Sequence, residues 1–80
     1  MPKLPQVSAR EVIAALKKIG FKKVSQKGSH IKLQRMTHRL TETIIVPNHK
    51  VIKSGTLRHG ILKPINLSVK DFLKILKQKL

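Results

Sequence analysis

Residues 27–34 read Lys-Gly-Ser-His-Ile-Lys-Leu-Gln, and this stretch decides the fold class of the chain. Its Gly-Ser pair is typical of a turn. After the turn, polar and apolar residues alternate, which is the pattern of a β-strand with one buried face. Ile31 and Leu33 then point toward a core, whereas His30 and Lys32 point to the opposite side. We therefore predict a strand that begins at His30.

Strand-like segments lie on both sides of this one. Residues 21–26 mix Phe21 and Val24 with lysines, which predicts a strand with one solvated face. Residues 41–46 are rich in β-branched side chains, and Pro47 ends that strand. Three consecutive strands joined by short turns predict an antiparallel meander.

An amphipathic helix is predicted before the strands. Residues 8–11, Ser-Ala-Arg-Glu, have the spacing of a capping box, in which the Ser hydroxyl and the Glu carboxylate each bind a free backbone amide at a helix start. Apolar residues then recur at helical spacing. We expect this helix over about residues 8–19, with Gly20 ending it.

Two more helices are predicted after the strands. Ser54 or Thr56 is expected to cap the second helix, and Pro64 to end or kink it. Its inward side chains are Leu57, Ile61 and Leu62. Residues 68–71, Ser-Val-Lys-Asp, form another capping box. That box opens a last amphipathic helix with the apolar stripe Phe72, Ile75 and Leu76.

This order of elements predicts an α+β fold of the α-β-β-β-α type. A three-stranded antiparallel sheet carries helices on one face, and a short helix ends the chain. The other face of the sheet must be open to solvent, and His30 and Lys32 should project from it. The 80 residues suffice for one domain and not for two, so we expect a single domain over residues 1–80.

The charge of the chain limits its partners. It holds 18 Lys and Arg against 3 Asp and Glu, a formal charge of +15. Such an excess favours a polyanionic partner: nucleic acid, an anionic membrane face or an acidic protein. The longest apolar run, residues 12–16, is far short of the ~20 residues of a membrane span, so no membrane contact is expected. The absence of cysteine fits a reducing cytoplasm.

The acidic residues are too few for metal chemistry. A nuclease that uses divalent metals needs several converging oxygen ligands. Glu11 and Asp71 occupy capping boxes, which leaves Glu42 uncommitted, and the histidines match no known ligand spacing. We therefore expect no metal and no cofactor. RNA carries its own nucleophile, the 2′-hydroxyl, so a histidine with nearby lysines is suited to RNA cleavage.

Four histidines are candidates for that role. His30 lies on the open face beside Lys32, where an imidazole can act as a general base. From the residues alone, a surface histidine is more often simply solvated. We expect His38 to be solvated in a loop, His49 to order its own loop, and His59 to lie on a solvated helix face.

Several motifs together resemble one family. They are Gly-Ser-His-Ile-Lys-Leu at 28–33, Val-Pro-Asn-His at 46–49, Gly-Thr-Leu-Arg at 55–58, the Gly-Phe helix end at 20–21, and Leu-Ser-Val-Lys-Asp-Phe at 67–72. In this order and at these separations they resemble the HicA family of toxin mRNA interferases, over nearly the whole chain.

The resemblance implies a fold like the double-stranded RNA-binding domain. It also implies metal-independent endonuclease cleavage of mRNA that arrests translation, and a cognate HicB-type antitoxin that covers and silences the toxin. The family's essential histidine lies in the Gly-Ser-His motif, which is His30 here. We expect His30 to be the general acid or base, and the RNA-binding residues to be Lys22, Lys23, Lys27, Ser29 and Lys32.

The expected protein is a cytoplasmic monomer when free and a hetero-oligomer with its antitoxin. Two other readings remain open. A non-catalytic basic RNA-binding module would explain the charge equally well, but it does not explain the Gly-Ser-His turn. The second alternative is a protein-interaction partner whose basic face binds an acidic surface. This alternative is compatible with a toxin that an antitoxin covers.

Overall fold

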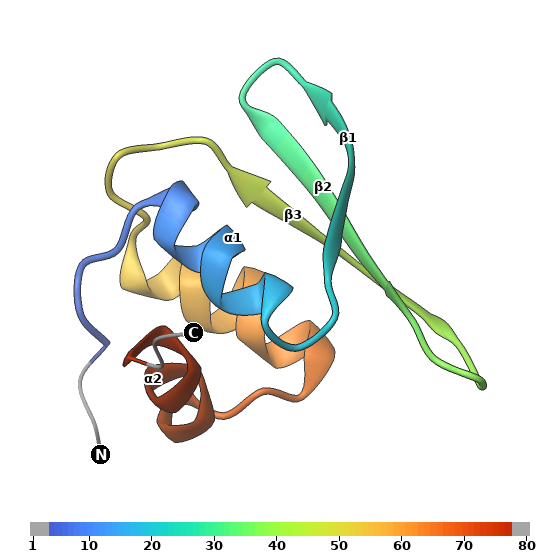
Figure 1. Cartoon of the computed structure of the whole chain (residues 1–80). Helices are drawn as coiled ribbons and strands as arrows, with labels where there is room; N and C mark the ends of the chain where they lie inside the picture. Colours follow the sequence, from blue (N-terminus) through green and yellow to red (C-terminus); the bar gives the residue numbers. More distant parts are fainter. Residues whose placement is uncertain (1–3, 78–80) are drawn as a thin grey trace.

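A computed structural model describes residues 4–77 of the chain (Figure 1). Its elements, in chain order, are α1 (Ala9–Lys17), β1 (Lys22–Lys27), β2 (His30–Met36), β3 (Thr41–Pro47), the π-type helix η1 (Thr56–Leu62), the 3₁₀ turn η2 (Lys63–Ile65) and α2 (Val69–Lys77). The predicted α+β class and the order of its elements are confirmed.

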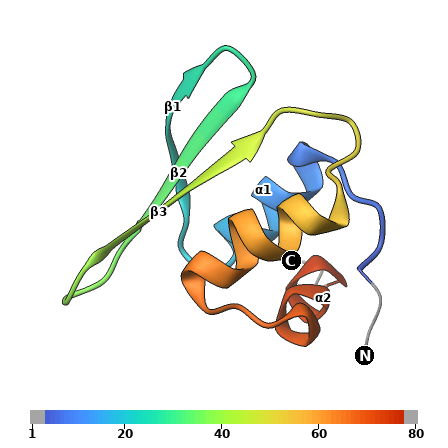
Figure 2. The same ribbon diagram turned by 180° about the vertical axis from the view of Figure 1, so that it is seen from behind.

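The three strands form one antiparallel sheet in the order β1-β2-β3, so β2 is the central strand. Figures 1 and 2 show the helices gathered on one side of this sheet, while its other side is uncovered. The β1–β2 and β2–β3 hairpins extend past the helices at opposite ends of the sheet. The predicted open face is therefore present.

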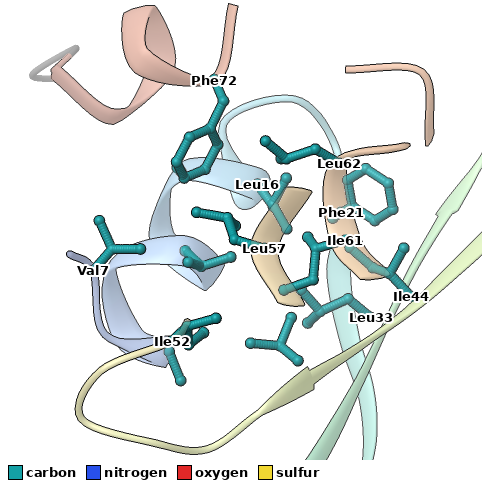
Figure 3. Packing of buried hydrophobic residues seen from close by; sticks show 14 of the residues in the cluster. Val7, Leu16, Phe21, Leu33, Ile44, Ile52, Leu57, Ile61, Leu62 and Phe72 are labelled. Atoms are coloured by element: carbon teal, nitrogen blue, oxygen red, sulfur yellow. The ribbon is translucent and has the colours of Figure 1, made fainter. Parts of the chain in front are cut away.

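The core lies between the sheet and the helices (Figure 3). The central and third strands contribute alternate side chains, Ile31, Leu33, Ile44 and Val46, as the period-2 pattern predicts. The helices contribute large buried side chains opposite them, among them Leu16, Leu57, Ile61, Leu62 and Phe72. Burying this apolar surface is the main free-energy term that holds the sheet and helices together.

The predicted capping box starts α1. The backbone amide of Ser8 donates to Oε1 of Glu11 at 3.0 Å, and the amide of Glu11 donates to Oγ of Ser8 at 3.1 Å. Gly20 follows the helix with a φ of 101°, a conformation that favours glycine. A Cβ at this position would also lie 3.3 Å from Cδ of Arg35, a tight contact that a small shift of this side chain would relieve, so the φ is the main reason for glycine in this turn.

A β-bulge in β1 changes which lysines share a face. Lys23 pairs with Leu33 and Ser25 pairs with Lys32, so Val24 is an extra residue between the two pairs. Directly opposed residues of an antiparallel pair lie on the same face. Lys23 therefore lies on the side of the core residue Leu33. All six residues of β1 are exposed, so this strand adds no buried side chain.

The segment between β3 and η1 is tied to the N-terminal segment. Ile52 and Val7 form an isolated antiparallel bridge, in which the amide of Ile52 donates to the carbonyl of Val7 at 2.7 Å. The amide of Ala9 donates to the carbonyl of His49 at 3.0 Å. Both Val7 and Ile52 are buried, so the bridge closes one end of the core.

The second helix differs from the prediction at its start, whereas Pro64 ends it as predicted. Thr56 lies inside η1, and neither it nor Ser54 makes a capping side-chain hydrogen bond among residues 4–77. The π-type ladder ends with the Lys63 amide donating to the Arg58 carbonyl. Pro64 has no amide hydrogen and cannot continue that ladder, so a 3₁₀ turn follows until Asn66, whose φ is 54°.

The last helix has one fully buried residue, and Val69, Ile75 and Leu76 also pack against the core while partly buried. Phe72 of α2 is fully buried, and its ring points into the cluster in Figure 3. Oγ of Ser68 accepts a hydrogen bond from the Asp71 amide at 3.0 Å, which is one of the two bonds of the predicted capping box. Nζ of Lys18 donates to the Ile75 carbonyl at 2.8 Å, which ties α1 to the end of α2.

In the part of the chain described, 4–77, no helix has the length and apolar character needed to span a bilayer.

Candidate nucleic-acid interface

The uncovered side of the sheet presents an ordered set of side chains, which we call the open face. Counted from the β1–β2 turn, three rows cross it from β1 to β3: Lys27, His30, Pro47; then Ser25, Lys32, Ile45; then Lys22, Gln34, Thr43. The third row contains a hydrogen bond of 3.2 Å from Nε2 of Gln34 to Oγ1 of Thr43. The register fixes these neighbours, because side chains that are directly opposed share a face.

His30 is the first residue of β2 and is exposed. Its strand is paired on both sides, and the next inward-facing residues, Ile31 and Leu33, are buried in the core. The amide of Asn48 donates to the carbonyl of Ser29 at 2.6 Å, which holds the turn before His30 against the end of β3. The backbone of His30 is thus held from several sides while its imidazole faces solvent.

The structure brings together only part of the predicted RNA-binding set. Lys27 and Lys32 line one surface hollow with His30, Ser25 and Ile45. Lys27 lies directly opposite His30, and Lys32 is the next residue of β2 on the same face.

The remaining predicted residues lie around or behind this hollow. Lys22 is on the open face but in the third row, opposite Gln34. Ser29 is exposed in the turn before His30. Lys23 lies on the other side of the sheet, and its Nζ donates to Oε1 of Gln26 at 2.8 Å. The bulge at Val24 is the physical reason for the separation of the two neighbouring lysines.

Comparison with protein-family models matches residues 9–67 to the HicA toxin of bacterial toxin–antitoxin systems. The chain belongs to the HicA toxin family. The match includes all three strands and the Gly-Ser-His turn. A search of curated proteins returned no match, and neither did a search of solved structures. As a HicA-family member, the protein is the toxin of a toxin–antitoxin system, and a HicB-type antitoxin is the partner that such a system implies.

The acidic residues of this HicA toxin lie away from the open face. Glu42 was expected to be uncommitted, and that expectation is wrong: its Oε1 lies 2.6 Å from Nη2 of Arg35 and accepts from Nε at 2.8 Å. Arg35 also donates to the Ile19 carbonyl at 3.0 Å and lies 4.7 Å from the centre of the Phe21 ring. This pair could not be predicted from local patterns, because Arg35 and Glu42 lie on two different strands and Arg35 also contacts the end of the first helix.

The open face therefore presents positive charge without a carboxylate. Glu11 is in the α1 cap, Asp71 is in the first turn of α2, and Glu42 is on the core side of the sheet. Within residues 4–77, no group of three or more His, Asp or Glu side chains is placed to hold a metal ion. Phosphates approaching the open face meet lysines, with no adjacent negative charge to repel them.

The other histidines of this HicA toxin do not line the hollow around His30. His38 is exposed in the β2–β3 turn, where Oγ1 of Thr37 accepts from the Leu40 amide at 3.1 Å. His49 orders its loop through its main chain, since its amide donates to Pro47 and its carbonyl accepts from Ala9. His59 is exposed on η1.

Ile45 is a residue of the hollow that the sequence did not single out. It stands in a run, Thr-Ile-Ile-Val at 43–46, in which three consecutive residues are apolar. Alternation alone does not tell which of them faces outward in such a run. The register with Lys32 decides it: Ile45 is 43% exposed, whereas Ile44 and Val46 are buried.

Proposed function

We propose that this HicA toxin is an endoribonuclease that cleaves mRNA without a metal ion, uses His30 as its general acid or base, and so arrests translation. One observation supports this more than any other. An exposed histidine on the central strand is flanked by Lys27 and Lys32 in one hollow, on a face without carboxylates. The toxin family of the chain is consistent with this activity.

The proposed reaction starts from the 2′-hydroxyl of the nucleotide before the cleaved bond. A ring nitrogen of neutral His30 takes the hydroxyl proton while O2′ forms a bond to phosphorus. The P–O5′ bond breaks, and O5′ leaves with a proton from the imidazolium or from water. The products are a 2′,3′-cyclic phosphate and a 5′-hydroxyl end. The reaction consumes no metal, cofactor or co-reactant, and DNA, which lacks the 2′-hydroxyl, is not a substrate.

The lysines of the hollow support the same step. Negative charge grows on the phosphate oxygens as O2′ attacks, and an ammonium group within reach of those oxygens lowers the energy of this transition state. Lys27 and Lys32 flank His30 across and along the sheet, and Lys22 extends the charge into the third row. Lys23 faces the other side of the sheet, so we assign it no contact with this RNA.

The antitoxin would control access to the same face. A HicB-type partner with an acidic surface complements the open face in charge and would exclude RNA while bound. We propose that the chain acts as one domain over residues 1–80, in the cytoplasm, as a monomer when free and as a hetero-oligomer with the antitoxin.

Cleavage in the presence of EDTA tests the proposal directly. Incubated with a defined mRNA and EDTA, the free toxin should cut the RNA and leave 2′,3′-cyclic phosphate and 5′-hydroxyl ends, which end-specific labelling detects. A DNA strand of the same sequence is the control and should stay intact. Activity that appears only after Mg²⁺ or Mn²⁺ is added would overturn the metal-free mechanism. Binding without cleavage under all conditions would favour a non-catalytic RNA-binding module.

The salt dependence of binding should separate Lys32 from Lys23. On single strands, the slope of log K against log salt is about −0.7 per neutralised phosphate. We expect Lys32→Ala to make the slope shallower by about 0.7 if Lys32 neutralises one phosphate. Lys23→Ala removes the same charge from the opposite side of the sheet and should change the slope much less. Fluorescence titration of labelled RNA at several salt concentrations measures both slopes, and equal changes would contradict this assignment.

A further inference from the structure

The third strand gives the open face an uncharged, partly apolar side. Pro47 lies opposite His30, and Ile45 lies opposite Lys32. Ile45 is 43% exposed and forms part of the same hollow as His30. An exposed isoleucine among lysines costs free energy in contact with water, and nothing in the core requires it, because Ile44 and Val46 already fill the buried positions of β3.

The charges of the open face are confined to the other two strands. Lys22 and Lys27 are on β1 and Lys32 is on β2, whereas β3 adds only uncharged side chains: Thr43, Ile45 and Pro47. An RNA strand whose phosphates follow the lysines would lie over β1 and β2. Its bases would then point to one side of that path, and β3 is the side of the sheet that offers them uncharged surface.

We propose that Ile45, with Pro47 beside it, is the aliphatic contact for a nucleobase next to the cleaved bond. The proposal rests on the proposed function and specifies its substrate class: single-stranded RNA with an unstacked base. A base in a duplex has both of its faces covered by neighbouring bases, so only an unstacked base can lay a face on Ile45. Neither of the chain's two aromatic residues can serve this purpose, because Phe21 and Phe72 are buried.

The antitoxin is the competing occupant of this position, and the small number of apolar residues beside the lysines favours RNA. A protein interface has an apolar core supplied by many residues a side. Here two residues, Ile45 and Pro47, supply apolar surface, and lysine, histidine and serine side chains border it on one side. A flat base with an adjoining phosphate matches this small apolar surface bordered by cations.

Binding of two probes with equal charge tests the inference independently of cleavage. One probe is a short 2′-O-methyl RNA, which the proposed chemistry does not cut. The other is the same ribose-phosphate chain without bases. The parent toxin should bind the probe with bases about fivefold more tightly, a difference expected from one small apolar contact. Ile45→Thr should lose most of this preference while keeping its affinity for the abasic probe.

Two further variants make the comparison specific. Ile45→Val keeps an aliphatic side chain and should keep most of the preference. Val51→Thr makes the same kind of change at a residue that is 51% exposed outside the sheet, and should leave the preference unchanged. Threonine and valine both suit a strand, so neither change at position 45 should disturb β3. Circular dichroism of each variant verifies the fold.

The outcomes separate this inference from the proposed nuclease activity. A parent toxin without a preference for the probe with bases, or an Ile45→Thr variant that keeps it, would overturn the inference even if RNA is cleaved in EDTA. A preference that depends on Ile45, in a toxin that never cleaves RNA, would support the base contact and overturn the nuclease. If Ile45→Thr weakens antitoxin binding alone, Ile45 belongs to the protein interface and the inference is wrong.

Discussion

Replacing His30 with glutamine is expected to lower the rate of the proposed RNA cleavage by about 10²–10⁴-fold, the contribution typical of a general acid or base. Glutamine is similar in size and can still form hydrogen bonds, but it cannot accept the proton of the 2′-hydroxyl. His30 is exposed, so the free energy of unfolding should change by no more than about 0.5 kcal/mol. RNA affinity should also remain close to that of the parent, because Lys27 and Lys32 are unchanged.

His38→Gln is the matched control for this experiment. His38 is also an exposed histidine at a hairpin turn, but it lies at the opposite end of β2 from His30. Single-turnover cleavage of a labelled RNA by parent, His30→Gln and His38→Gln gives the three rates. Cleavage by His30→Gln at the parent's rate would exclude His30 from the chemistry, and a loss common to both variants would point to folding instead.

Phe72→Ala should cost about 3–5 kcal/mol of folding free energy, because it removes a fully buried ring and leaves a cavity. A domain of 80 residues has a total stability of only about 4–12 kcal/mol, so this variant is expected to be partly or wholly unfolded at 37 °C. Phe72 is the one buried residue of α2, so losing its ring should detach this helix from α1 and η1. Urea denaturation followed by circular dichroism measures the change.

Two variants test whether the effect comes from the cavity. Phe72→Leu keeps an apolar side chain in the site and should cost only about 1–2 kcal/mol. Lys74→Ala changes an exposed residue of the same helix and should stay within about 0.5 kcal/mol of the parent. A cost below about 1 kcal/mol for Phe72→Ala would show that α2 adds little to the core. The family match ends at residue 67, so this result concerns a segment beyond it.

Much of the fold could be predicted from local patterns. Alternation around Ile31 and Leu33 gave the central strand and its buried face, and the spacing of Ser8 and Glu11 gave the start of α1. Each of these features depends only on residues that are close in sequence, in the same helical turn or the same strand. Local physical rules, side-chain periodicity and amide capping, are therefore sufficient to predict them.

The features that the sequence did not reveal depend on pairing across the chain. The bulge at Val24 exists only relative to β2, and it decides that Lys22 shares a face with His30 while Lys23 does not. The ion pair between Glu42 and Arg35 could not be predicted either, because it requires the register of β2 with β3. The alternation rule correctly predicted which residues of β2 lie on the open face. Which residues of β1 and β3 lie there with them depends on the register of all three strands.

The strand β1, which buries none of its side chains, has a consequence for how this toxin can change over evolutionary time. Substitutions on β1 leave the core untouched, so the number and order of its lysines can be altered at little cost in stability. His30, by contrast, belongs to a strand whose alternate residues are required for folding. Selection by a new antitoxin, or by a new RNA if the proposed function holds, can therefore act on β1 while His30 stays at the same position of β2. Sequence divergence among such toxins should accordingly concentrate on this outer strand.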